Sequence, residues 1–256
     1  MRFILPIIAH FLGDFILQSS TMVSNKKTRV PFFVFHCLIY SALMILSLIW
    51  FAPVKNVIYV ALIIIISHTV IDYIKNIWLN KLSKRGGDHK TSDFTLFIVD
   101  QVLHILIILC AVHLLYSTNS VGKVLMSYLL LHFSSQRLYN VAIIAFLYII
   151  CLSPAAVLIK KVFILFSFQN NEDLSTKEDI IKSGYLIGVL ERVIILTLGL
   201  NGQIGAIGFV LAAKSLARFN QLNDKSFAEK YLVGTLLSVA IALFCIVIGN
   251  SVIKIL

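Results

Sequence analysis

Charged side chains are scarce in this chain, at 13% of 256 residues against 59% hydrophobic ones. A soluble domain usually has roughly 25% charged and 45–50% apolar residues, so a soluble globular class is excluded. The four cysteines form no CxxC pair, and therefore neither a disulfide framework nor a thiolate metal site is indicated. The apolar runs also lack the alternation with period two that membrane strands require. No small-residue cleavage site follows the apolar start, so no cleavable signal peptide is predicted.

Long apolar runs are present instead, and they predict an all-α, polytopic transmembrane helical bundle. We expect about eight spanning or nearly spanning helices and one interfacial or re-entrant helix over 121–135. The polar run Gln169–Lys182 is the longest hydrophilic connection and indicates a boundary between two modules, at 1–118 and 169–256, with connecting interfacial and transmembrane helices over 119–168. The eight expected helices cover roughly 3–18, 31–51, 56–79, 93–116, 138–161, 183–200, 204–219 and 231–254.

Basic residues fix the expected orientation in the membrane. Most Lys and Arg residues fall in four loops, after the first, third, fifth and seventh apolar segments. These loops share one side of an eight-helix bundle, and the positive-inside rule makes that side cytoplasmic. The net charge of +10 is therefore explained by topology, and no nucleic-acid partner is expected. We predict a multi-pass protein of the cell inner membrane with both termini outside.

Three apolar segments each carry one His and one Asp four residues apart. This spacing places both side chains on one face of a helix. In the predicted topology all three pairs lie at one depth, toward the cytoplasmic side. The pairs are His10 with Asp14, His68 with Asp72, and Asp100 with His104.

The paired residues suggest a divalent metal site within the membrane. An Asp at the bilayer centre costs about 2.5–3.5 kcal/mol, so such groups need a partner, water or a cation. Carboxylate and imidazole ligands together suit Zn, Mn or Fe. Six ligands exceed the needs of one tetrahedral ion, so the set accommodates one or two ions. Gln18 and Gln101 are expected to bind water or substrate, and His36 is either a seventh member or a structural residue. A proton or ion relay and a metal-free polar network remain as alternatives.

A second polar set follows in the C-terminal module. One interpretation is a clamp for a phosphate or a lipid headgroup near the cytoplasmic surface. The other is an intramembrane ion pair with cations that extend toward the membrane surface. The set comprises Glu191, Arg192, Lys214 and Arg218.

Several motifs resemble a bacterial family of uncharacterised polytopic membrane proteins, classed as a domain of unknown function. The matching stretches are HFLGDFILQ from His10, HTVIDYIK from His68 and DQVLH from Asp100. GYLIGVLERVIIL, AAKSLARF and Glu229 before Gly234–Thr235 also look like its longer members. The resemblance implies a shared fold and brings no established activity. A more distant likeness is to membrane-bound metal-dependent hydrolases regulated with DNA damage, although their HR and HS dipeptides are missing here.

These observations support three functional hypotheses. The first is a metal-dependent hydrolase that cleaves an amphiphilic or lipid phosphate or ester from the cytoplasmic leaflet, with Lys75, Lys214 and Arg218 neutralising the substrate. Metal-activated water is the expected nucleophile, because no Ser or Cys nucleophile with a base is evident. The second is a transporter or channel for divalent cations or protons, although no internal repeat is detected. The third is a non-catalytic membrane effector with a polar core. The oligomeric state, the metal and the substrate are not determined by the sequence.

Overall fold

A computed structural model describes all of the chain except residues 27–28, 52, 86–88, 118–134, 167–173 and 256. Its described residues form helices and no strand, which confirms the all-α class. The chain divides into two compact units, Met1–Ala142 and Ile143–Leu256. The expected helix over 121–135 lies almost wholly outside the described residues. The predicted module boundaries at 118 and 168 stay predictions.

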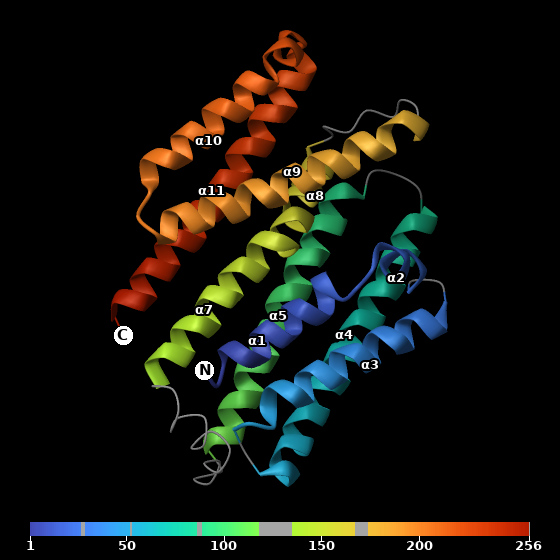
Figure 1. Cartoon of the computed structure of the whole chain (residues 1–256). Helices are drawn as coiled ribbons and strands as arrows, with labels where there is room; N and C mark the ends of the chain where they lie inside the picture. Colours follow the sequence, from blue (N-terminus) through green and yellow to red (C-terminus); the bar gives the residue numbers. More distant parts are fainter. Residues whose placement is uncertain (27–28, 52, 86–88, 118–134, 167–173, 256) are drawn as a thin grey trace. The chain divides into compact units, whose positions relative to one another are not determined.

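The first unit is built on three long helices, with the N-terminal segment against them. Helix α3 packs on α4, α4 packs on α5, and α1 with its extension η1 packs on α3 (Figure 1). A short helix, α2, precedes α3 and was not expected from hydropathy, because it is one and a half turns long and polar. The elements are α1 Ile4–Phe11, η1 Leu12–Ile16, α2 Ser20–Asn25, α3 Val30–Leu48, α4 Val54–Arg85 and α5 Lys90–Ser117.

The second unit contains the remaining helices. Helix α9 packs along α11, and a Cβ atom at Gly199 would overlap the Ile246 side chain, so this contact needs glycine. Gly202 has φ of +74° and ends α9, as is typical of the residue after a helix. The elements are α7 Ser135–Leu152, which begins at the end of the first unit, α8 Pro154–Leu165, α9 Leu174–Leu200, α10 Ile204–Ala217, η2 Phe219–Asn223 and α11 Lys225–Ile255.

Three expected helices differ from the observed ones. The segment 138–161 is not one uninterrupted helix, because α7 ends at Leu152 and Pro154 starts α8. Proline has no N–H and its ring clashes with the preceding turn, so it interrupts a helix. Helices α9 and α11 also begin well before the expected residues 183 and 231, since their polar first turns extend the helix beyond the apolar run.

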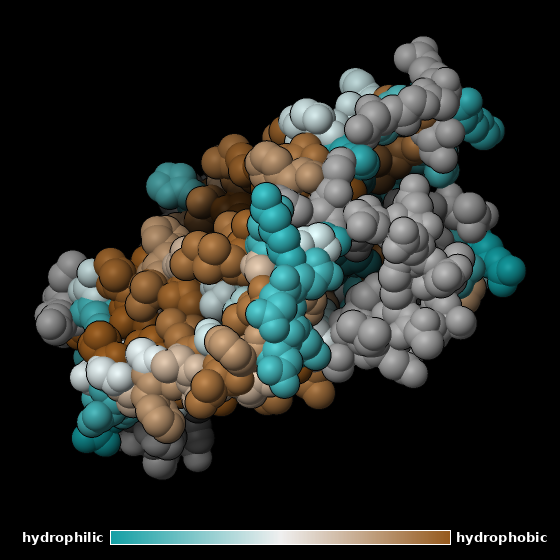
Figure 2. All heavy atoms as spheres, turned by 90° about the horizontal axis from the view of Figure 1, so that it is seen from above, coloured by the Kyte–Doolittle hydropathy of each residue, from teal (hydrophilic) through white to brown (hydrophobic). Residues whose placement is uncertain are grey.

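Several helices of the described chain have the length and composition of membrane spans. Five helical segments qualify, namely Val30–Leu48, Val54–Leu82, Lys90–Leu115, Gln136–Leu165, which joins α7 and α8, and Lys225–Ile253. Ile4–Ile16 and Ile204–Ala217 are shorter apolar helices, at the two positions where short ones were expected. Large hydrophobic side chains such as Leu38, Tyr59 and Ile66 are exposed, and Figure 2 shows broad hydrophobic patches on one face. The chain is thus a multi-pass membrane protein, and the count of eight spans stays a prediction.

The core of the first unit is apolar over one part of the helices only. From Tyr40 to Leu48 on α3, from Val57 to Ile64 on α4, and from Ile108 to Leu115 on α5, the buried side chains apart from Ser47 form one hydrophobic cluster. The next buried positions toward the other end of the same helices are polar. A dry core and a polar layer therefore lie end to end along α3, α4 and α5.

Candidate metal centre

The polar layer brings all three His/Asp pairs together. His10, His68 and Asp72 are fully buried, and Asp100 and His104 expose 3% and 2% of their surface. Asp14 exposes 8% of its side chain. His36, which the sequence left open as a seventh member, is also fully buried and belongs to the cluster. We call these seven side chains the His/Asp cluster.

Asp14 lies in a π-helical turn rather than in the α-helix that the spacing predicted. Helix α1 ends at Phe11, and the Leu17 amide donates to the Leu12 carbonyl oxygen at 2.8 Å, five residues back. Single π turns are often found at functional sites, where they turn a side chain out of its helical position. Buried Gly13 in this turn lets it approach α3, because an added Cβ would lie 3.2 Å from Tyr40 Cδ2.

The most compact part of the cluster joins Asp14, His36 and His68. Nε2 of His36 lies 3.2 Å from Nε2 of His68. Oδ1 of Asp14 lies 3.6 Å from His36 Nε2 and 3.7 Å from His68 Nε2. Oδ2 of Asp72 lies 3.4 Å from His36 Nε2. With metal–ligand bonds of about 2.0–2.2 Å, tetrahedral ligands are separated by roughly 3.3–3.6 Å, so the spacing suits a bound ion.

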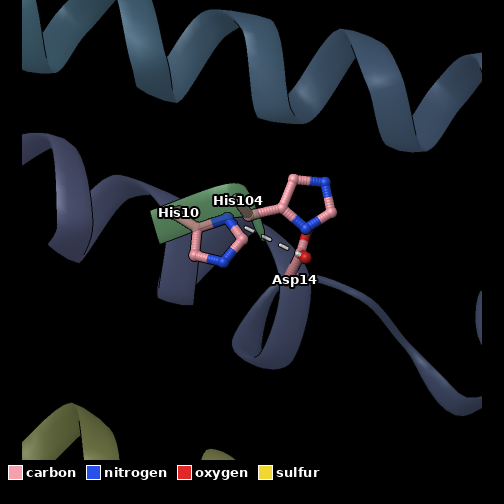
Figure 3. Close-up of side chains that lie close together, drawn as sticks. All are labelled: His10, Asp14 and His104. Atoms are coloured by element: carbon pink, nitrogen blue, oxygen red, sulfur yellow. Dashed lines mark ion pairs between the residues drawn. The ribbon is translucent and has the colours of Figure 1, made fainter. Parts of the chain in front are cut away.

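The other oxygen of Asp14 faces a second group. Oδ2 of Asp14 lies 3.9 Å from Nδ1 of His10, and Figure 3 shows the His104 ring beside them. The His10 and His104 ring centroids are 5.2 Å apart. Ligand atoms of the three residues lie within 4.8 Å of one another. Nδ1 of His10 and both ring nitrogens of His104 are buried without a hydrogen-bond partner, as is Oδ1 of Asp14. Buried polar atoms are rarely left in this state, so these atoms fit a cation.

Two ammonium groups contact the carboxylates of the cluster. Lys75 donates to Asp72 Oδ1 at 2.6 Å and to Asp100 Oδ2 at 2.8 Å. Lys26 donates to Asp72 Oδ2 at 3.0 Å. The Lys75 side chain is 19% exposed and the Lys26 side chain 9%, so Lys75 is the one that extends toward the outside of the unit. Nothing in the spacing of Lys26 connects it to Asp72, so the sequence indicates only a charge in the loop after the first apolar segment.

The two predicted glutamines also contact the cluster. Gln101 donates from Nε2 to Asp100 Oδ2 at 3.0 Å, and its Oε1 lies 3.3 Å from His10 Nε2. With its amide turned so that both ends are satisfied, Gln18 donates to the Asp14 carbonyl oxygen and accepts from Lys26 Nζ. Both glutamines therefore hold members of the cluster in place.

The four predicted residues of the C-terminal module do not form one group. Lys214 donates to Glu191 and, at 3.0 Å, to the Thr235 hydroxyl. Arg192 donates instead to the Cys151 carbonyl oxygen at 2.7 Å and to Ser238 at 3.4 Å. Arg218 lies near Gln221 and the Phe227 ring. The contacts of Glu191 and Lys214 are those of an intramembrane ion pair, and the anion-clamp interpretation stays a prediction.

One family matches the chain. The family described as Protein of unknown function (DUF3307) matches residues 2–131. The chain belongs to this family. The matched residues include every member of the His/Asp cluster and both lysines, whereas Glu191 and Lys214 lie beyond them. No curated protein and no solved structure matches the chain. The family description names no activity.

Proposed function

We propose that this member of the family is an integral membrane hydrolase that depends on a divalent metal, Zn, Mn or Fe. The observation that carries the proposal is the group of donor atoms from Asp14, His36 and His68, which lie 3.2–3.7 Å apart, with Asp72 Oδ2 3.4 Å from His36 Nε2. Asp14 lies in η1, His36 on α3, and His68 and Asp72 one turn apart on α4, so three elements hold the donors. Mixed nitrogen and oxygen ligands of this kind suit these metals.

A divalent ion in the cluster would polarise the scissile group and lower the pKa of a bound water toward about 7. The water oxygen would then bond to the phosphorus or carbonyl carbon of the substrate, and the bond to the leaving oxygen would break. The unpartnered Oδ1 of Asp100 is suited to accept the water proton, which returns to the leaving oxygen. Oxygen and hydrogen balance in this reaction, and no oxidant or reductant is consumed.

The two lysines indicate an anionic substrate. Lys75 is the most exposed of these side chains at 19%, whereas Lys26 and Asp14 expose 9% and 8%, so a substrate that approaches from outside the unit would meet the Lys75 ammonium group first. Beyond the cluster, α4 continues to Lys81, Lys84 and Arg85. Basic ends of this kind are cytoplasmic, and we therefore propose a lipid or amphiphilic phosphate or ester reached from the cytoplasmic leaflet. An inner-membrane location with both termini outside belongs to the same proposal.

The apolar core argues against a transport path through the same residues. From Ile64 back to Val57 on α4, and from Ile108 to Leu115 on α5, the buried side chains are hydrophobic. At about 1.5 Å per residue these stretches are roughly 10 Å long. A path for ions or protons needs polar groups or water across the membrane, whereas this polar layer ends against packed side chains.

The first test is metal content and metal-dependent hydrolysis. We would purify the protein in mild detergent, measure bound metals by elemental mass spectrometry, and assay phosphate release from dioctanoylphosphatidic acid in mixed micelles. A p-nitrophenyl acyl ester would separate ester from phosphate cleavage. We expect one or two equivalents of metal, and loss of both metal and activity in His68→Ala and Asp72→Asn.

The matched control is His113→Ala, since His113 lies on α5 but is exposed and outside the cluster. Size-exclusion profiles and thermal unfolding would show that the variants remain folded. A wild-type protein that binds no Zn, Mn or Fe after reconstitution would overturn the metal site. Bound metal with neither ester nor phosphate cleavage would overturn the hydrolase.

A further inference from the structure

We propose that the cluster holds two divalent ions bridged by the carboxylate of Asp14, and that its substrate is a phosphoric ester rather than a carboxylic ester. This inference rests on the metal site of the proposed function and specifies its number of ions and its substrate class. The argument starts from Asp14, which belongs to two separate groups of candidate ligands.

One oxygen of Asp14 faces the first ion site. Oδ1 lies between the Nε2 atoms of His36 and His68, at 3.6 and 3.7 Å. Both imidazoles therefore direct their Nε2 atoms toward Asp14 Oδ1, where the first ion would bind. Nδ1 of His68 remains on the far side of its ring, and the ring is held flat against Tyr40.

The other oxygen faces a second site with its own ligands. Oδ2 of Asp14 is the carboxylate oxygen nearest to Nδ1 of His10, at 3.9 Å. His104 joins this group from α5, and Figure 3 shows its ring beside Asp14. His10 and His104 are 0% and 2% exposed, and three of their four ring nitrogens have no hydrogen-bond partner. One ion at the first site would leave these nitrogens buried and unpaired, which proteins rarely tolerate.

Asp100 extends the second site. Its Oδ1 lies 3.7 Å from His104 Nδ1 and has no hydrogen-bond partner, whereas Oδ2 is held by Lys75 and Gln101. Ligand atoms of Asp72, Asp100 and His104 also come within 4.8 Å of one another. The second ion would thus have Asp14, His10 and His104 as its donors, with Asp100 beside His104 as the carboxylate that accepts the proton of the attacking water.

The charge of the site favours two ions with a phosphate. Three carboxylates and two ammonium groups leave the cluster with one net negative charge when its histidines are neutral. Two divalent ions change this to three positive charges, which a phosphate dianion and one hydroxide neutralise. A single divalent ion with the phosphate dianion and the hydroxide would leave two net negative charges buried. Buried net charge is costly. A neutral carboxylic ester would leave the two-ion centre with two positive charges.

The geometry also suits phosphoryl chemistry. Two ions bridged by one carboxylate are typically about 3.5–4 Å apart, which lets them contact both the attacking and the leaving oxygen of an in-line displacement. A water-derived oxygen would bond to phosphorus on one side while the alcohol oxygen leaves on the other and takes up a proton. Lys26 and Lys75 would contact the remaining phosphate oxygens.

The test is a titration of metal-free protein with Mn²⁺, followed by equilibrium dialysis and electron paramagnetic resonance. We expect two equivalents and a spectrum of exchange-coupled ions. His10→Gln and His104→Gln should bind one equivalent and give the six-line spectrum of an isolated ion. His113→Ala should remain indistinguishable from the wild type. Hydrolysis of dioctanoylphosphatidic acid should fall at least a hundredfold in both Gln variants.

One equivalent with an isolated-ion spectrum in the wild type would overturn the two-ion centre and leave the metal site of the proposed function intact. Absence of any bound Mn²⁺, Zn²⁺ or Fe²⁺ would overturn both. Two equivalents without coupling would show that Asp14 does not bridge them. Cleavage of the acyl ester in preference to the phosphate would overturn the substrate class alone.

Discussion

The ring of Tyr40 lies flat against the imidazole of His68, with centroids 3.6 Å apart and planes 6° apart. Tyr40 is the first member of the apolar core on α3, and His68 is a member of the His/Asp cluster on α4. This contact is therefore the boundary between the dry and the polar parts of the first unit. It holds a candidate metal ligand in one orientation.

We expect Tyr40→Phe to keep the stack and to be at least as stable as the wild type. The Tyr40 hydroxyl is buried without a hydrogen-bond partner, and its removal therefore costs little. Tyr40→Ala should lose about 3 kcal/mol of unfolding free energy, because it opens a cavity beside His68. Thermal unfolding in detergent and Mn²⁺ affinity would check both. Weaker Mn²⁺ binding in a folded Tyr40→Phe would instead assign the hydroxyl to the metal site.

Gly13 should set how closely Asp14 approaches the cluster. A methyl group at Gly13 would lie 3.2 Å from Tyr40 Cδ2, so Gly13→Ala requires a shift of a few tenths of an ångström. Gly13→Leu should displace η1 with Asp14 and weaken Mn²⁺ binding at least tenfold, about 1.4 kcal/mol. Gly208→Ala is the matched control, because a Cβ there meets nothing within 4 Å. Unchanged Mn²⁺ affinity in folded Gly13→Leu would contradict a role for Asp14 as ligand.

Lys75 should stabilise the metal-free protein. Lys75→Met removes the ammonium group that contacts buried Asp72 and Asp100. We expect the metal-free variant to lose about 3 kcal/mol of unfolding free energy. Added Mn²⁺ should raise the unfolding temperature more in this variant than in the wild type, since the ion replaces the missing charge. Lys81→Met, at an exposed position of the same helix, should change neither value. Equal responses to Mn²⁺ in the wild type and Lys75→Met would argue that the ion binds away from these carboxylates.

The pair of Glu191 and Lys214 offers a test between the two interpretations of the C-terminal set. If the two residues form an ion pair, Glu191→Gln and Lys214→Met should each lose about 3 kcal/mol of unfolding free energy. The double variant should recover part of this loss. Thermal unfolding would measure all three proteins, with Lys225→Ala, at an exposed position outside the set, as the neutral control. If the anion-clamp interpretation is right, folded Lys214→Met should instead lose affinity for inorganic phosphate, measured by equilibrium dialysis.

The sequence by itself determined the class of the protein and most members of the site. Low charge and long apolar runs leave only helices as spanning elements, because every backbone polar group must be paired inside lipid. The spacing of His10 with Asp14, His68 with Asp72, and Asp100 with His104 placed each pair on one helix face. The positions of the basic loops then predicted that the three pairs lie at the same depth in the membrane.

Only the tertiary structure decided which atoms face one another. The contact of Lys26 with Asp72 joins residues 46 apart, and no local pattern encodes it. His36 gains its place from the crossing of α3 and α4, because a lone histidine carries no periodic signal of its own. The π turn at Asp14 depends on Gly13 packing against Tyr40, which hydropathy does not register. Periodicity reports the face of a helix, whereas the rotation and contact of neighbouring helices depend on side-chain packing between them.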